Sequence, residues 1–327
     1  MQKGLFTQGI AVLLSESVSI ERIHKLLQGQ FDIGDITYSS EKWAYGGPSF
    51  LIPLRTEVNG YVLVDAVDRP WPDGMGDPQQ DARLFDAWSM GQFGPFAYPG
   101  NLERAVHQGW GSYPEGRQAA EKHRAFVRIR TSYILGDTVG DDAPILPEGY
   151  DARQEMVMLM SIAAKLLAEL PEALCYFNPG GECLASGEMI RQEWEAVERG
   201  GQMELDTWSN VRMYSLPQGE GWLLMDTVGM WQLDVPDHEA VFRKGACEPD
   251  DLADFLRNLS LHFLHNDLEP GEAVVAKGPG GIAWQGELYD NGIAHPPRQV
   301  VRWQIQGGEI DGIPEKETHL RIGEISQ

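Results

Sequence analysis

Two aspartates occupy the same place in a sequence segment that occurs twice. The segment Gly60–Val67 (GYVLVDAV) recurs as Gly221–Val228 (GWLLMDTV), and four of the eight positions are identical. Asp65 and Asp226 are equivalent in the two copies. Two carboxylates that meet in one cleft can work as an acid and a base, so this pair is the first catalytic candidate. The alternative is that each aspartate anchors a turn at the end of its strand.

A second candidate for chemistry is a histidine pair near the end of an expected helix. His262 and His265 are three residues apart, a spacing that can place two imidazoles on one metal ion, and Asp237 and His238 could add ligands. Neither an H-E-x-x-H motif nor a cysteine pair accompanies them, and imidazoliums near a helix end also suit the helix dipole. We therefore assign no metal and no cofactor, and keep His262 as a third catalytic suspect.

A long segment rich in glycine, proline and aromatic residues, 69–117, separates the two copies. Loops of this length in compact domains are functional or disordered, and disordered segments are poor in aromatic residues. We expect an ordered excursion that either caps an open end of a sheet or forms the wall of a binding surface. Under the second interpretation, the binding residues are Trp71, Trp88, Phe93, Phe96, Tyr98 and Trp110.

Hydrophobic periodicity predicts the elements that must position these residues. In the first half, strands are expected at 9–16, 33–38, 50–54 and 60–67, and helices at 19–27 and 81–90. In the second half, strands are expected at 125–135, 173–177, 209–216 and 221–228, followed by 274–276, 281–288 and 300–306. Helices are expected from Asp151 to the residues before Pro171, at 187–198 and at 250–265.

Each copy of the repeated segment is thus the last strand in a similar series of elements, which runs strand, helix, strand, strand, strand. A helix follows the series in both copies. The predicted fold class is α+β, with two tandem duplicated units of mainly antiparallel sheet and helices packed on one face. We place the first unit at 1–120, with the aromatic excursion, and the second at 121–327, with an inserted helix at 187–198 and the C-terminal strands.

Composition and charge limit the classes of function. The 327 residues are 42% hydrophobic and 23% charged, as expected for a folded protein, and no apolar run reaches the length of a membrane span. The amino terminus does not resemble a signal peptide, and the three cysteines form no disulfide framework, so we expect a cytoplasmic protein. A formal net charge of -23 disfavours nucleic acid and anionic membranes. The same charge either steers a basic protein partner or simply keeps the protein soluble.

Four stretches carry a resemblance to a known family. They are Arg69–Pro78 (RPWPDGMGDP), Ala87–Gly100 (AWSMGQFGPFAYPG), Leu174–Glu182 (LCYFNPGGE) and Leu223–Gly229 (LLMDTVG). Together they resemble the bacterial domain-of-unknown-function family numbered 4261, over about residues 9–303. The resemblance implies a bacterial cytoplasmic protein and transfers no catalytic residue. Such proteins resemble those encoded beside secretion-system and toxin clusters, which implies an immunity or accessory role.

Two hypotheses of function follow from these observations. The first is a non-catalytic protein-binding protein of the immunity or accessory type, whose partner is a protein such as a basic toxin and whose anchors are exposed aromatic residues. The second is a hydrolase with a cleft between the two α+β units, which uses Asp65 and Asp226 as paired carboxylates together with His262. Enzymes gather polar groups in a pocket, whereas binding proteins spread aromatic residues over an open face.

Overall fold

The structure is a computed structural model that divides into two compact units. It describes residues 3–38, 45–110, 113–135, 144–201, 205–216, 221–266 and 274–307. Unit 1 comprises the described residues of 1–107 and 112–208, and unit 2 those of 108–111 and 209–327. The boundary predicted between residues 120 and 121 does not coincide with this division, because the strand at 125–132 pairs with two strands of the first half.

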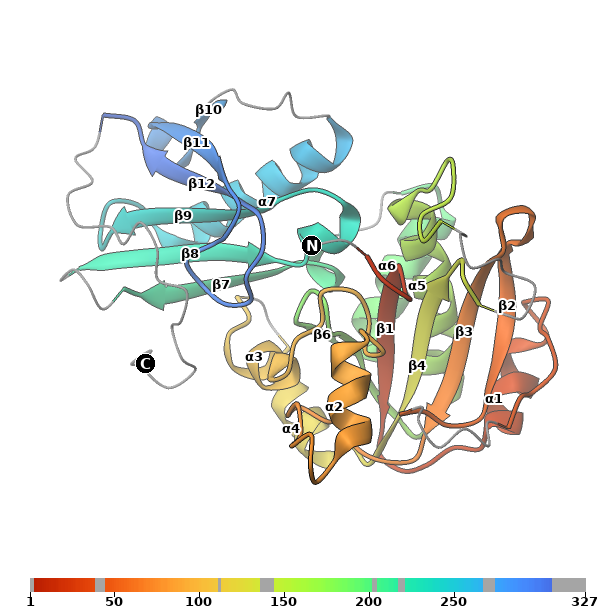
Figure 1. The fold of residues 1–327 in the computed structure, drawn as a ribbon. Helices are drawn as coiled ribbons and strands as arrows, with labels where there is room; N and C mark the ends of the chain where they lie inside the picture. Colours follow the sequence, from red (N-terminus) through yellow and green to blue (C-terminus); the bar gives the residue numbers. More distant parts are fainter. Residues whose placement is uncertain are drawn as a thin grey trace. The chain divides into compact units, whose positions relative to one another are not determined.

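Unit 1 is built on a six-stranded sheet, sheet 1, in which every neighbouring pair is antiparallel. Its strands are β1 (Gln8–Leu14), β2 (Ser49–Arg55), β3 (Gly60–Val67), β4 (Ala125–Ser132), β5 (Ala173–Asn178) and β6 (Cys183–Ala185). They follow the order β2-β3-β4-β1-β5-β6, which places β4 and β1 in the middle (Figure 1). The chain therefore returns to the centre of the sheet after the aromatic excursion.

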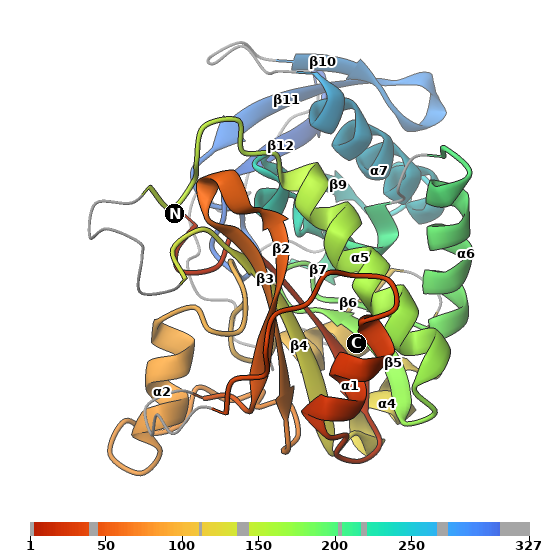
Figure 2. The same ribbon diagram turned by 90° about the vertical axis from the view of Figure 1, so that its right-hand side faces the viewer.

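Three helices of unit 1 begin where capping residues predict. Ser19 caps α1 (Ile20–Leu27), Asp151 caps α5 (Ala152–Glu169) and Ser186 caps α6 (Gly187–Glu198), each by accepting a backbone N–H bond. α5 packs on β1 and β5, and α1 and α6 both pack against α5. Figure 2 shows α1 and α5 on one side of sheet 1 and α2 (Ala82–Ser89) on the other.

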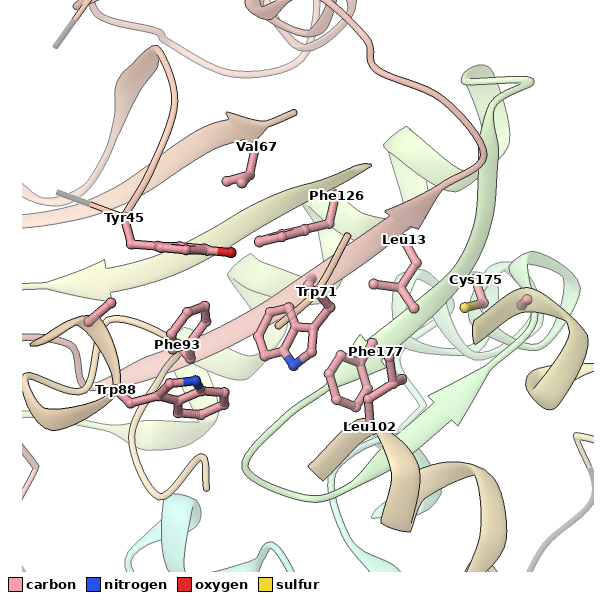
Figure 3. Packing of buried hydrophobic residues seen from close by; sticks show 13 residues of the cluster. Leu13, Tyr45, Val67, Trp71, Trp88, Phe93, Leu102, Phe126, Cys175 and Phe177 are labelled. Atoms are coloured by element: carbon pink, nitrogen blue, oxygen red, sulfur yellow. The ribbon is translucent and has the colours of Figure 1, made fainter. Parts of the chain in front are cut away.

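The aromatic excursion covers the second face of sheet 1. It contains α2 and α3 (Asn101–His107) and leads into α4 (Gly116–Lys122), and all three helices contribute to one buried cluster. Trp71 lies at the centre of that cluster, with ring centroids 5.0–5.2 Å from those of Phe93, Phe126 and Phe177 (Figure 3). All eight residues of β4 are consequently buried, although its alternating sequence is typical of a half-buried strand.

Unit 2 contains the second six-stranded sheet, sheet 2, in the order β10-β11-β12-β9-β8-β7. Its strands are β7 (Asn210–Ser215), β8 (Trp222–Val228), β9 (Asp237–Arg243), β10 (Val274–Lys277), β11 (Ala283–Tyr289) and β12 (Val300–Ile305). Four of the five strand pairs are antiparallel, and β9 and β12 are parallel. The helix α7 (Pro249–His265) covers one face through Leu252, Leu256 and Phe263. The fold class of two α+β units is confirmed.

The repeated segments form β3 and β8, the central strands of two antiparallel meanders. β3 lies between β2 and β4, and β8 lies between β7 and β9. Beyond the meanders the sheets differ, because β1 runs antiparallel to β4 whereas β12 runs parallel to β9. The elements β4, α5, β5 and α6, which were predicted to belong to the second copy, lie in unit 1. The likeness of the two units is therefore clear only in the meander.

Several elements differ from the sequence prediction. The strand expected at 33–38 is reduced to one bridge between Thr37 and Ser49. β6, β9 and the short helices α3 and α4 were not predicted. Among the described residues, no helix combines the length and apolar character needed to cross a membrane.

The close approach of the excursion to sheet 1 makes a testable prediction at Gly9. A Cβ atom at this position of β1 would lie 2.9 Å from Gly94 Cα and 3.3 Å from Arg130 Cγ. Gly9→Ala should therefore lower the unfolding free energy by about 1–3 kcal/mol, the usual cost of overpacking. Urea denaturation followed by tryptophan fluorescence measures this change. Gly29→Ala is the control, because a Cβ there has no atom within 4 Å, and equal midpoints for both variants would contradict the close contact.

Candidate functional site

Asp65 lies in a buried ion network on the face of sheet 1 that the excursion covers. Arg128, directly opposite on β4, donates its Nε to Asp65 Oδ1 at 3.1 Å and its Nη2 to Oδ2 at 2.7 Å. Arg130 Nη2 donates to the same Oδ1 at 3.1 Å. The Nη1 atoms of both arginines donate to the carbonyl oxygen of Gln92, at 2.9 and 2.7 Å. The arginines thus hold both the carboxylate and the backbone of the excursion.

The charges around Asp65 favour a structural role for this carboxylate over a catalytic one. Burial raises the pKa of Asp65, but the charges of Arg128 and Arg130 outweigh burial and bring the pKa below its usual value. Burial together with the neighbouring Arg128 lowers the pKa of Arg130 to about 9. The Arg130 guanidinium also lies over the Phe6 ring, 3.8 Å from its centroid. Asp65 is therefore a paired anion rather than a proton donor or a general base.

Asp226 has a similar environment built from different elements of unit 2. Arg212 on β7 donates its Nε to Asp226 Oδ1 at 3.0 Å and its Nη2 to Oδ2 at 2.6 Å. Arg298, from the segment before β12, also donates to Oδ2 and lies 3.3 Å from Asp237 Oδ2 through its Nε. Asp237 in turn accepts from Thr227 Oγ1 at 2.9 Å. All of these side chains are almost fully buried.

A row of charged side chains runs across sheet 2 at this level. Arg212 is directly opposite Asp226, which is directly opposite Glu239 on β9. Glu239 is directly opposite Arg302 on β12 and accepts its Nε–H. The segment between β11 and β12 covers the row, because the Ile293 N–H donates to Glu239 Oε2 at 2.8 Å and Arg298 Nη1 donates to the Ala294 carbonyl at 3.0 Å. The segment between β11 and β12 thus covers this row of charged side chains.

Most of this network lies in the part of the chain that resembles a known family. Residues 226–304 match the family model described as Domain of unknown function (DUF4261). This DUF4261 segment runs from Asp226 through β9, α7, β10 and β11 to β12. It is shorter than the likeness predicted over residues 9–303, and of the four quoted stretches it contains only part of Leu223–Gly229. No curated protein and no solved structure matches the chain.

Each carboxylate of the predicted catalytic pair is thus engaged by two arginines of its own unit. The third suspect, His262, is exposed on α7, where Asn266 Nδ2 lies 3.3 Å from its Nδ1. His238 is buried instead, and burial lowers its pKa to about 3. Within the described part of the chain, no group of three or more histidine, cysteine, aspartate or glutamate side chains could hold a metal ion. The geometry assembles no acid–base pair from these residues.

The six predicted binding residues divide into two groups. Trp71, Trp88 and Phe93 belong to the buried cluster of unit 1 and are 1–6% exposed, so they are core residues and not part of an open binding face. The other three, Phe96, Tyr98 and Trp110, are only partly buried. The prediction failed for the first group because sequence alone does not show that the excursion folds back on sheet 1. The other interpretation, a cap on an open end of the sheet, differs as well, because the excursion covers a face of sheet 1.

Trp110 joins unit 2 beside an acidic helix terminus. Its backbone N–H donates to the Val211 carbonyl on β7 at 2.7 Å, and its carbonyl accepts from Arg257 Nη2 at 2.8 Å. The indole Nε1 donates to Asp250 Oδ1 at 3.2 Å in the first turn of α7. Glu248, Asp251 and Asp254 are exposed in the same region of the chain. Trp110 is therefore held in place and partly accessible, with the carboxylate of Asp250 bonded to its indole.

The buried charges cancel within each unit. With histidine counted as neutral, the buried acidic side chains in the described part of unit 1 are Asp65, Glu155, Glu182 and Glu193, and the buried basic ones are Lys3, Arg104, Arg128 and Arg130. In the described part of unit 2, they are Asp226, Asp237 and Glu239 against Arg212, Arg298 and Arg302. The rest of the chain consequently carries the whole formal charge of -23. The acidic character is a property of the residues outside these cores.

Sequence analysis missed a further buried cluster around Glu155 on α5. Thr7 Oγ1 donates to Glu155 Oε1 at 2.6 Å, and the Tyr150 hydroxyl donates to Oε2 at 3.1 Å. Lys3 Nζ donates to the Tyr150 oxygen at 2.5 Å. Burial raises the pKa of Glu155 against the effect of these hydrogen bonds and of Lys3. No motif marks the cluster, because its members are far apart in sequence and Glu155 resembles an ordinary first-turn carboxylate.

The Asp65 network predicts how stability depends on pH. Asp65→Asn should lower the unfolding free energy at neutral pH by about 3–5 kcal/mol, because it leaves two buried arginines without their anion. Since the pKa of Asp65 is lowered by folding, its contribution is complete above the unfolded value of about 3.9 and is lost as the pH falls through the folded-state value. The difference in unfolding free energy between the wild type and the variant, measured by urea denaturation, should therefore become smaller as the pH is lowered into the acid range. Asp32→Asn, at an exposed position, is the control. A gap that stays constant or widens in acid would rule out this role.

Proposed function

We propose that the protein is a non-catalytic binding protein of a bacterial cytoplasm, of the immunity or accessory type, which recognises a basic protein partner. The observation that carries this proposal is the separation of charge: buried charges cancel within each unit, and the excess negative charge lies on the rest of the chain. A surface of one sign attracts a partner of the opposite sign and raises the rate of association.

Trp110 is the residue at which we expect the partner to bind, because acidic residues lie at the start of α7, which it contacts. Tryptophan is enriched among the residues that dominate binding energies at protein interfaces. Trp110 is fixed by two backbone hydrogen bonds and one indole hydrogen bond, so little conformational entropy is lost when a partner covers it. The exposed carboxylates at the start of α7 would face the basic groups of that partner.

The alternative of a hydrolase built on Asp65 and Asp226 has no support in this geometry. A general base must be free to accept a proton from the substrate or from water. Both carboxylates instead accept charge-assisted bonds from two arginines, and both are nearly inaccessible to solvent. Their position in the repeated segment is explained by the fold.

Affinity purification of the full tagged chain after crosslinking in its native host tests the proposal. We expect a stoichiometric protein of basic isoelectric point, whose affinity for the purified chain falls as salt is raised. Glu248→Gln with Asp251→Asn should weaken binding and reduce its salt dependence, whereas Asp32→Asn with Asp35→Asn, at exposed positions of unit 1, should do so less.

Trp110→Ala should weaken the same complex by about 10–30-fold, the effect of losing a binding hot spot. Isothermal titration calorimetry with the purified partner measures this loss. Leu288→Ala is the control, since Leu288 is an apolar side chain of unit 2 that is 53% exposed. Circular dichroism checks that both variants are folded. Recovery of no stoichiometric partner would contradict the proposal, and full affinity of a folded Trp110→Ala protein would exclude Trp110 as the anchor.

A further inference from the structure

A pocket of about 350 Å³ opens in unit 1 at one end of sheet 1. β1 and β3 end there, β4 begins there, and the first residues of α1 form the opposite wall. Its volume is at the lower end of the range for small-ligand pockets, which is about 300–1,000 Å³. None of the predicted site residues lines it, so the pocket is separate from the networks described above.

The inner wall of the pocket is apolar. The residues Leu14, Val18, Ile20, Val67 and Phe126 line it, and each is buried with an exposure of 7% or less. Phe126 is also part of the packed aromatic cluster beneath, where its ring lies 5.1 Å from Trp71. A well-packed floor of this kind keeps its shape and favours an apolar group over water.

The outer wall carries two carboxylates that hydroxyl groups hold in place. Ser17 Oγ donates to Asp68 Oδ1, and the Tyr38 hydroxyl donates to Glu21 Oε1. Within the described residues, neither carboxylate forms an ion pair with lysine, arginine or histidine, in contrast to every carboxylate of the Asp65 and Asp226 networks. Hydroxyl bonds orient a carboxylate and leave its charge uncompensated.

The pocket therefore has an apolar interior below a rim of two oriented, unneutralised carboxylates. We propose that it binds a small organic cation, in which a primary ammonium group is attached to an apolar body about the size of a phenyl ring. The body would fill the space lined by Leu14, Val18 and Ile20, and the ammonium would lie between Asp68 and Glu21 at the rim. The start of α1 would by itself favour an anion, but Glu21 in its first turn already compensates the helix dipole.

Such a ligand has two sources, a free amine and the amino-terminal residue of a peptide chain. Both present an ammonium group beside an apolar side chain, so the shared chemistry is the same. The proposal does not rest on the proposed function, because a small ligand and a protein partner of unit 2 are independent. Each can therefore fail without the other.

Three probes with one aromatic body and different head groups test the proposal on the full chain. They are phenethylamine, 2-phenylethanol and 3-phenylpropionate, which carry a positive, a neutral and a negative group. Two-dimensional amide NMR should show saturable shifts at residues 17–21 and 66–68 with phenethylamine, and binding at least about fivefold weaker with the other two probes. Tighter binding of the alcohol or the acid, or shifts from the amine only outside these residues, would overturn the proposal.

Two substitutions test the roles of the carboxylates. Asp68→Asn and Glu21→Gln should each weaken phenethylamine binding by about fivefold, and Asp32→Asn at an exposed position should not. Unchanged affinity in both carboxylate variants would overturn the assignment of the rim. The peptide amide Phe-Gly-Gly distinguishes the sources, since binding as tight as that of phenethylamine indicates a chain terminus and weaker binding indicates a free amine.

Discussion

The structure depends on the need to match every charge that it buries. A carboxylate in the interior is stable only if an opposite charge and enough donors replace the water it has lost. Arginine meets this need well because its planar guanidinium presents several N–H groups in a fixed fork. Arg128 and Arg130 use the remaining donors on the Gln92 carbonyl, and Arg298 uses its own on the backbone around Ala294. The arginines that neutralise the buried aspartates therefore also hold in place, through hydrogen bonds to the backbone, the segments that cover the two sheets.

This constraint explains what the repeated segment shares and where its copies differ. In both copies an aspartate on the central strand of a meander is buried beside two arginines. In sheet 1 both arginines come from β4, whereas in sheet 2 one comes from β7 and the other from the segment before β12. The position of the buried aspartate is the same in both copies, but the arginines that neutralise it come from different elements. The repeated aspartate thus has a structural role in the central strand of each meander, and its repetition does not indicate a catalytic pair.

Local features of the fold could be predicted, and long-range ones could not. Ser19 and Asp151 mark helix starts through their own side chains, and local hydrophobic patterns mark β1, β3 and β4, because these signals act between near neighbours. β9 was missed because Asp237 and Glu239 are typical of a loop until Arg298 and Arg302 neutralise them from sixty residues away or more. The burial of Trp71 and the position of β4 likewise depend on contacts across the sheet. The pocket near Asp68 joins four separate segments and leaves no motif.

The same constraint separates the charges that build the fold from those that are free to recognise a partner. Because the described cores are electrically balanced, the net charge of -23 contributes no buried pairing, and its self-repulsion opposes the compact state. Folding therefore gives no reason for so large an excess. Solubility is one use of such an excess, and the proposed recognition of a basic partner is another. The proposed basic partner would meet this excess outside the cores, for example at the exposed carboxylates of Glu248 and Asp251 at the start of α7.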